Sequence, residues 1–173
     1  MALRPILTFE HPVLREKAKK VSRVDASMQR LIDDLAETML AAPGAGLAAN
    51  QIGVALRVCV VKGDENQIWG LINPEIVRFD GVQVGYEGCL SYPGWVGEVA
   101  RHETVVVKGR NRHGKDVRIK SSGFTARAFQ HELDHLDGIL FIDRLTSLDT
   151  LHRVEDVARE DKEEAVAAAA ASG

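Results

Sequence analysis

Cysteine is scarce in this chain, which has only Cys59 and Cys89 among its 173 residues. One pair of cysteines cannot build the disulfide framework of a small secreted domain. Charge of either sign is not in large excess, because 22 basic residues face 25 acidic ones and the net charge is -3. A chain without a basic excess lacks the electrostatic footprint of a nucleic-acid-binding or membrane-adhering protein. We therefore expect no direct nucleic-acid or membrane partner.

Long hydrophobic runs are also missing. No apolar stretch approaches the roughly 20 residues that a membrane-spanning helix needs. The opening residues, Met-Ala-Leu-Arg-Pro-Ile-Leu, have neither the layout of a secretory signal nor the Arg- and Ser-rich character of a transit peptide. These features and the low cysteine content favour the reducing cytoplasm as the location of the protein.

The overall composition is typical of a globular protein, with 45% hydrophobic and 27% charged residues. A chain of this length usually forms one domain with its own core. We find no internal repeat and no Pro/Gly/Ser-rich linker. We expect a catalytic domain over residues 1–147. Residues 148–173 should form a C-terminal helix with an Ala-rich acidic tail, either part of the same domain or frayed.

Hydrophobic spacing predicts an α+β fold. Apolar residues recur at helical spacing from Asp25 to Ala42, with Asp25 as N-cap and Pro43-Gly44 as stop signal. Helical spacing returns over residues 125–137 and 148–171. Short β-branched or alternating runs predict strands at residues 57–62, 68–72, 76–79, 82–86, 104–108 and 117–120, the last two joined by a His113-Gly114 turn. We expect mostly antiparallel strands around a central helix, with an N-terminal and a C-terminal helix besides.

Two histidines stand four residues apart in the segment His131-Glu132-Leu133-Asp134-His135. On a helix this spacing puts both imidazoles on one face, where they can bind a divalent metal at roughly 2.0–2.1 Å. Glu132 can then take a proton from a water whose pKa the metal lowers toward about 7. This HExxH pattern is short, so a solvated polar helix face is the alternative if the segment stands alone. The pattern indicates a metal-dependent hydrolase.

A catalytic metal of this kind needs a third protein ligand and one open position. Cys89 offers a thiolate in Glu87-Gly88-Cys89-Leu90-Ser91, just after a predicted strand. Glu155 and Glu160 lie downstream, at a separation where one class of metalloproteases supplies a glutamate ligand. A small buried apolar residue is the ordinary alternative for a free cysteine, and Cys59, inside a run of valines, fits that alternative better.

A glycine-containing stretch, residues 44–51, ends in Asn50-Gln51. It lacks the Lys-Ser/Thr ending of a phosphate-binding loop and precedes a strand instead of following one. Its glycines suit a loop whose backbone approaches a ligand closely. The Gln51 side-chain amide could donate to a developing oxyanion. An ordinary tight turn with Gln51 exposed is the alternative.

Three segments, residues 44–51, 87–91 and 130–138, together resemble the signature motifs of the peptide deformylases. They occur in the order and at the spacing of that family, and the opening stretch from Ile6 to Val21 is similar as well. The resemblance covers almost the whole chain except the C-terminal tail. It implies hydrolysis of the N-terminal formyl group of formyl-methionyl nascent peptides, with release of formate.

The resemblance also implies roles for individual residues. The metal ligands would be Cys89, His131 and His135. The general base, and later the acid for the leaving amine, would be Glu132. The oxyanion would be stabilised by the side chain of Gln51 and the backbone N–H of Leu90. Substrate contacts would come from Gly46, Ala45 and Glu87. Ferrous iron is the metal expected in the cell, and zinc, nickel or cobalt can occupy such a site.

A metalloprotease with a downstream glutamate ligand and an inactive formyl-peptide-binding relative are the alternative functions. Trp95 either covers apolar substrate surface or is simply packed. From Leu151 onward, three basic residues face six acidic ones, and ribosomal RNA repels such a helix. Any transient ribosome contact should therefore not run through the acidic tail.

Overall fold

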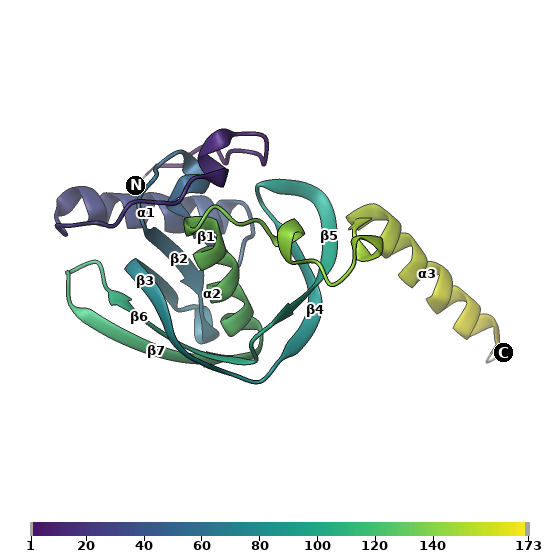
Figure 1. Ribbon diagram of the computed structural model, residues 1–173. Helices are drawn as coiled ribbons and strands as arrows, with labels where there is room; N and C mark the ends of the chain where they lie inside the picture. The colour runs from purple at the N-terminus through teal and green to yellow at the C-terminus, as the bar shows by residue number, and fades with distance from the viewer. Residues whose placement is uncertain (1, 172–173) are drawn as a thin grey trace.

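A five-stranded antiparallel sheet forms the body of the computed structural model, which describes residues 2–171 (Figure 1). Its strands, in spatial order, are β1 (Gly46–Ala48), β2 (Val58–Lys62), β3 (Ile68–Asp80), β6 (Thr104–Arg110) and β7 (Asp116–Ser122). A second antiparallel sheet consists of β4 (Gln83–Cys89), β5 (Tyr92–Arg101) and β8 (His152–Arg153). The predicted α+β fold with mostly antiparallel strands is confirmed.

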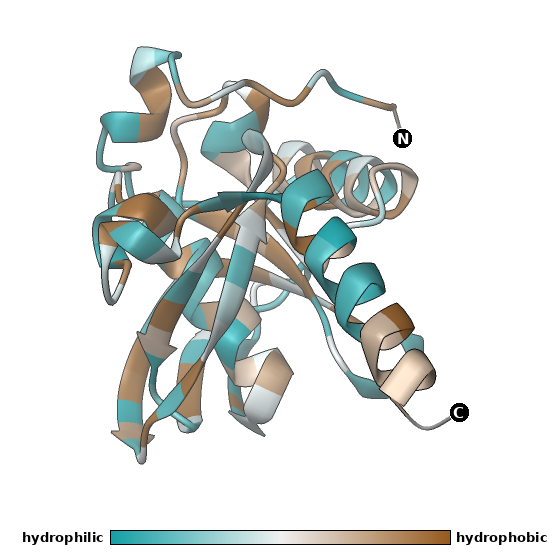
Figure 2. Ribbon diagram, turned by 90° about the vertical axis from the view of Figure 1, so that its right-hand side faces the viewer, coloured by the Kyte–Doolittle hydropathy of each residue, from teal (hydrophilic) through white to brown (hydrophobic). Residues whose placement is uncertain are grey.

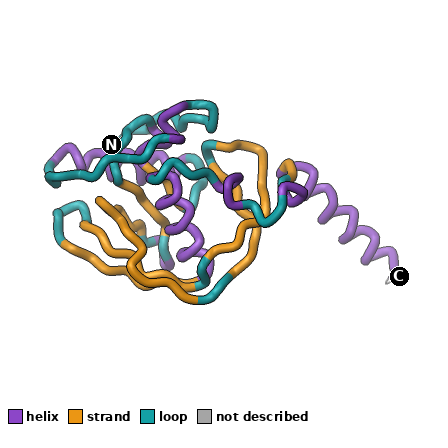
Figure 3. The backbone as a smooth tube through the Cα atoms, viewed as in Figure 1, coloured by secondary structure: helices purple, strands orange, loops and turns teal. Residues whose placement is uncertain are grey.

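Three α-helices accompany these sheets: α1 (Ala26–Ala41), α2 (Gly123–Leu136) and α3 (Val154–Ala171). Short 3-10 helices link the elements at Pro12–Arg15, Ala49–Ile52, Asp64–Asn66, Phe141–Arg144 and Leu148–Thr150. Helix α2 lies between the strands of the two sheets, as the tube in Figure 3 shows. This central position brings the HExxH segment next to strands from both sheets.

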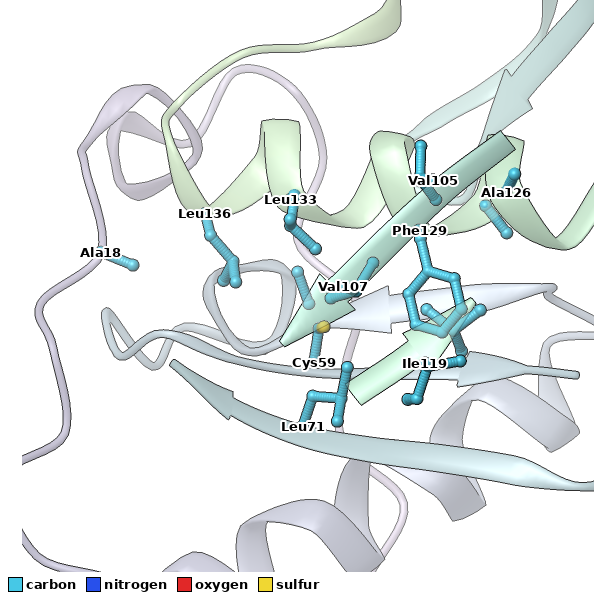
Figure 4. Packing of buried hydrophobic residues seen from close by; sticks show 13 residues of the cluster. Ala18, Cys59, Leu71, Val105, Val107, Ile119, Ala126, Phe129, Leu133 and Leu136 are labelled. Atoms are coloured by element: carbon cyan, nitrogen blue, oxygen red, sulfur yellow. The ribbon is translucent and has the colours of Figure 1, made fainter. Parts of the chain in front are cut away.

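Strand β2 is buried on both faces, which explains its unbroken apolar sequence. Cys59 and Val61 pack in a cluster with Phe129, Leu133 and Leu136 of α2 (Figure 4). Val58 and Val60 belong to a second cluster, which contains the following α1 residues: Leu31, Ile32, Leu35 and Met39. Helices α1 and α2 therefore cover opposite faces of the five-stranded sheet, and this packing fixes α2.

Local signals account for the ends of α1. The Asp25 carboxylate accepts hydrogen bonds from the backbone N–H groups of Ser27 at 2.9 Å and Met28 at 3.3 Å, as an N-cap does. Hydrogen bonds from Ser27 lower the pKa of this carboxyl. The helix ends at Ala41, just before Pro43. The predicted helix is confirmed to within one residue at each end.

Three expectations about the strands need correction. Residues 68–72 and 76–79 belong to one strand, β3, which continues through Asn73-Pro74 with a register shift where it pairs with β6. A bulge of this kind absorbs the missing N–H of Pro74. Residues 46–48 form the short edge strand β1 and not only a loop. Strand β5 was not expected, because Pro93, Gly94 and Gly97 interrupt its alternating pattern.

The C-terminal region also differs from the single helix expected over residues 148–171. The chain first forms a 3-10 turn and then β8, and α3 begins only at Val154. Helix α3 projects away from the body and has no buried residue (Figure 1). Hydrophilic residues dominate its first turns, and the Ala-rich end is paler in Figure 2. Residues 172–173 of the expected tail lie outside the described part. No helix among the described residues is long and apolar enough to cross a membrane.

Candidate metal centre

Helix α2 and the end of β4 bring three metal-binding side chains together. The donor atoms of Cys89, His131 and His135 all lie within 4.8 Å of one another. The His135 Nε2 atom is 3.3 Å from the Cys89 sulfur and 3.2 Å from His131 Nε2. Three donors this close suit a single ion bound at roughly 2.0–2.3 Å from each. Cys89 and the two histidines thus form the one group of potential ligands found among the described residues.

A buried carboxylate orients the first histidine. Glu87 Oε2 lies 3.1 Å from His131 Nδ1, which leaves Nε2 directed to the other ligands. The same carboxylate accepts hydrogen bonds from Arg101 at 2.8 and 2.9 Å and from Arg127 at 3.1 Å. Burial opposes ionisation of Glu87, but the hydrogen bonds and charges of His131 and Arg101 lower its pKa well below the usual range. Glu87, expected to contact substrate, thus has both oxygens bonded within the protein.

The network extends to a second buried carboxylate. Arg101 also donates to Asp134 at 2.6 Å, and Arg144 donates to the same residue at 2.7 and 2.9 Å. Arg101 therefore links the strand that carries it to the helix that carries both histidines. No local sequence pattern marks Arg101, because its partners lie 14 and 33 residues away. The role of Arg101 therefore could not be predicted from the sequence.

The electrostatic field of the site favours positive charge between the ligands. Burial lowers the pKa of His135 well below its usual value, and the nearby positive groups His131 and Arg101 lower it further. Burial also opposes protonation of His131, but Cys89, Glu87 and Glu132 raise its pKa well above the usual value. The ionised carboxylate of Glu87 beside His131 would equally stabilise a divalent cation. The donor set and its surroundings therefore fit a metal ion.

Glu132 lies beside the ligands and inside the fold. Glu132 is only 4% exposed, and its Oε2 atom has no hydrogen-bond partner among the described residues. Burial raises the pKa of Glu132 to about 7, and the charges of Glu87 and Asp134 act in the same direction. A carboxyl group with a pKa near neutrality can both accept and return a proton at physiological pH.

Gly46 explains how Glu132 fits. A Cβ atom added at Gly46 would lie 2.6 Å from Glu132 Oε1 and 2.7 Å from Glu132 Cγ. Atoms cannot approach so closely, so any larger residue would displace the carboxylate. The glycine is required here for close approach, and not for an unusual backbone angle.

We expect Gly46→Ala to lower the catalytic rate by about 100-fold, the effect of an ångström-scale misplacement of a reacting group. The metal content should stay that of the original chain, because Gly46 is not among the three ligands. Rate and bound metal are measured on the same preparation. An alanine variant with an unchanged rate would show that the Glu132 position is not critical.

Gln51 and Ser91 form a polar edge next to the cysteine. The Gln51 side-chain N–H donates to Ser91 Oγ at 3.1 Å and lies 3.8 Å from the Cys89 sulfur. Its carbonyl oxygen accepts from the backbone N–H of Ala48 at 2.9 Å, which fixes the orientation of the amide. Gln51 is 2% exposed, so the alternative of an exposed turn residue is wrong. The amide N–H groups of Gln51 thus lie beside the sulfur of Cys89 and the hydroxyl of Ser91.

A cleft of about 480 Å³ leads to these residues. The polar residues that line it include Gln51, Glu87, His131 and Glu132. Its walls are mainly apolar or backbone groups, among them the following residues: Ala45, Gly46, Leu90, Trp95, Val96 and Val154. The sequence-predicted residues of all three motifs are therefore neighbours in one cleft. Glu155 and Glu160, the alternative third ligands, lie exposed on α3 and outside the ligand group.

We expect Glu87→Gln to weaken metal binding by roughly 10- to 100-fold, the usual effect of losing a partner that orients a ligand histidine. A neutral amide cannot balance the positive charges of Arg101 and Arg127. It also has an NH2 group, which donates a hydrogen bond, in place of one of the two acceptor oxygens on which His131 and the arginines depend. Glu75→Gln is a matched control, because Glu75 is exposed and its one ion pair among the described residues is with Lys108 at 3.8 Å. Chelator competition gives both affinities. Equal affinities for the two variants would refute the orienting role.

The sequence of this chain is similar to those of known peptide deformylases. The family model described as "Polypeptide deformylase" matches residues 3–151. The peptide deformylase of Dehalococcoides mccartyi (strain CBDB1) is 54% identical over 155 residues, which is 89% of this chain and 93% of the relative. That of Thermomicrobium roseum is 49% identical and covers 95% of this chain and 98% of its own length.

Solved structures are similar as well. The peptide deformylase from Thermotoga maritima superposes with a TM-score of 0.81 at 40% identity, covering 85% of this chain and 100% of that one. The one from Legionella pneumophila has a TM-score of 0.81 at 43% identity and covers 96% and 98%. A peptide deformylase from Acinetobacter baumannii with Met-Ala-Ser bound has a TM-score of 0.79 at 35% identity and covers 83% and 100%.

Proposed function

Since this chain belongs to the polypeptide deformylase family of enzymes, we propose that it removes the N-terminal formyl group from formyl-methionyl nascent peptides and releases formate. The observation that carries this proposal is the convergence of Cys89, His131 and His135 beside the buried carboxylate of Glu132. A three-ligand site with an adjacent carboxylate suits catalysis, whereas a structural metal site usually has four protein ligands. The proposed location is the cytoplasm.

The metal would be held by Cys89, His131 and His135. A bound divalent ion supplies Lewis-acid chemistry, which activates water and polarises a carbonyl oxygen. Ferrous iron is the proposed metal in the cell, and zinc, nickel or cobalt fit the same donors. Activity that falls quickly in air would support iron, because exposure oxidises the ion and its thiolate ligand.

The chain's own residues perform the remaining tasks. Glu132 takes a proton from the attacking water and passes it to the leaving amine, which its buried position beside the ligands supports. The Gln51 amide and the backbone N–H of Leu90 donate to the oxyanion that develops on the formyl oxygen. Loss of one such donor typically costs ~10²–10³ in rate. The backbone of Ala45 and Gly46, on the cleft wall, binds the substrate near its formyl end.

Mass spectrometry on two peptides tests this proposal. Formyl-Met-Ala-Ser should lose its formyl group and become Met-Ala-Ser, the tripeptide found in the Acinetobacter baumannii structure. Acetyl-Met-Ala-Ser should stay intact, because a methyl group takes the place of the formyl hydrogen next to the ligands. Cleavage of internal peptide bonds would instead support a metalloprotease, and binding without any loss of the formyl group would support an inactive relative.

The acidic tail makes a further expectation testable. From Glu155 to Glu164, six acidic residues face Arg159 and Lys162, and this charge should be repelled by ribosomal RNA. Removal of residues 155–173 should therefore leave co-sedimentation with ribosomes unchanged. The intact chain, measured at the same salt concentration, is the control. Loss of co-sedimentation in the shortened chain would show that α3 is a ribosome anchor after all.

A further inference from the structure

The outer edge of β5 is covered by the part of the chain that follows helix α2. Leu145 forms a β-bridge with Val99. The backbone of Glu98 accepts from the Thr146 N–H at 2.9 Å and donates to Thr150 Oγ1 at 3.1 Å. Strand β8 then continues along the same edge. This returning segment therefore belongs to the sheet that delivers Cys89, although it lies beyond the three motifs.

Strand β8 ends at the cleft. In the pairing of β5 with β8, Trp95 lies opposite Arg153 and Val96 lies opposite His152. The Arg153 guanidinium stands 5.2 Å from the centre of the Trp95 ring, at a distance that gives a favourable cation–π contact. Trp95, Val96 and Val154 all line the cleft. Figure 1 shows α3 beginning beside β5, and Val154, the first residue of this helix, is one of those that line the cleft.

We propose that Trp95, Val96, Arg153 and Val154 form a substrate subsite, here called the outer lip. It would take apolar side chains that follow the formylated methionine in the peptide. This inference rests on the proposed function and deepens it. It also interprets Trp95, which would cover apolar substrate surface. The catalytic domain expected to end at residue 147 would then extend functionally to Val154.

The chemistry of the outer lip supports an apolar occupant. Its cleft-lining side chains are an indole and two valines, and Val154 is 48% exposed although it is apolar. A peptide side chain that covers such surface gains roughly 25 cal/mol per Å² of apolar area removed from water. Arg153 is a positioning residue in this arrangement. It is paired with Trp95 on the neighbouring strand, and its guanidinium contacts the indole ring. The lip is separate from the ligands, which lie on β4 and α2.

Two substrates and four variants test the outer lip. Formyl-Met-Ala is too short to cover an apolar site beyond its second residue, and formyl-Met-Ala-Leu-Leu-Ala extends further. Arg153→Ala and Val154→Ser should each raise KM for the pentapeptide about fivefold with kcat unchanged, because they remove uniform binding. Both constants for the dipeptide should stay the same. Arg159→Ala and Val166→Ser are matched controls on the exposed part of α3 and should change nothing.

The outcomes separate the two proposals. Unchanged pentapeptide KM in both lip variants would overturn the outer lip while leaving the proposed function intact. An equal loss with both peptides would also overturn it, because the residues would then act on the site as a whole. If the original chain released no formate, the proposed function would fail. Binding of an unformylated pentapeptide would then test the outer lip separately. In a Trp69→Phe background Trp95 is the only tryptophan, so addition of Met-Ala-Leu-Leu-Ala should change the tryptophan fluorescence, and Arg153→Ala should weaken that binding.

Discussion

Glu132→Gln is expected to lower kcat for formate release by ~10²–10⁴-fold, the usual contribution of a general acid–base group. Glutamine keeps the size of the side chain but cannot accept a proton from water. Glu132 is buried, lines the cleft, and has an Oε2 atom without a hydrogen-bond partner among residues 2–171, so the lost group is one that could contact water in the cleft. Steady-state kinetics with a formyl-Met peptide measures the change.

The controls for this prediction are metal content and a second glutamate. Removal of the Glu132 charge should leave the ion bound, because Glu132 is not one of the three ligands. Glu160→Gln changes an exposed glutamate on α3 and should have the original kcat. Formate release by Glu132→Gln at the original rate would contradict its assignment as the base.

Cys89→Ser should have the second large effect, which is loss of the metal. A hydroxyl is a much weaker ligand than a thiolate. We expect affinity to fall by more than the roughly 10- to 100-fold that loss of an outer partner costs. Metal analysis after gel filtration measures the ion that each variant retains.

The chain offers matched controls for Cys89. Cys59→Ser removes the other cysteine, which is fully buried between β2 and α2 and has a pKa raised by burial. It should lower stability and keep the metal. Glu155→Ala and Glu160→Ala should also keep it. Metal retention by Cys89→Ser together with loss in a glutamate variant would favour a metalloprotease-like ligand set instead.

The residues of the three motifs could be found from the sequence, because each motif is local. The spacing of His131 and His135 predicts a shared helix face, and Cys89 stands in a short glycine-containing segment after a strand. Their convergence is a tertiary property, which only the packing of α2 between the sheets reveals. The role of Glu87 was hidden for the same reason, since its partners Arg101 and Arg127 come from other elements.

The errors in the fold prediction have a common cause as well. Strand β5 contains Pro93 and two glycines, which normally mark turns, yet its pairing with β4 keeps the strand extended. Strand β8 has only two residues and exists because β5 has an edge to pair with. Patterns along the chain do not record partners that are distant in sequence. The elements with strong internal periodicity, such as α1, were predicted well.

Formate release by metal-loaded protein is the most direct test of the central claim that Cys89, His131, His135 and Glu132 form a deformylase site. The protein is purified without oxygen and loaded with ferrous iron, and formate and free amine are measured from formyl-Met-Ala-Ser. We expect equal amounts of both products, loss of activity after chelation, and recovery when the ion is returned. Free amine without formate, or activity that survives complete removal of the metal, would contradict the account.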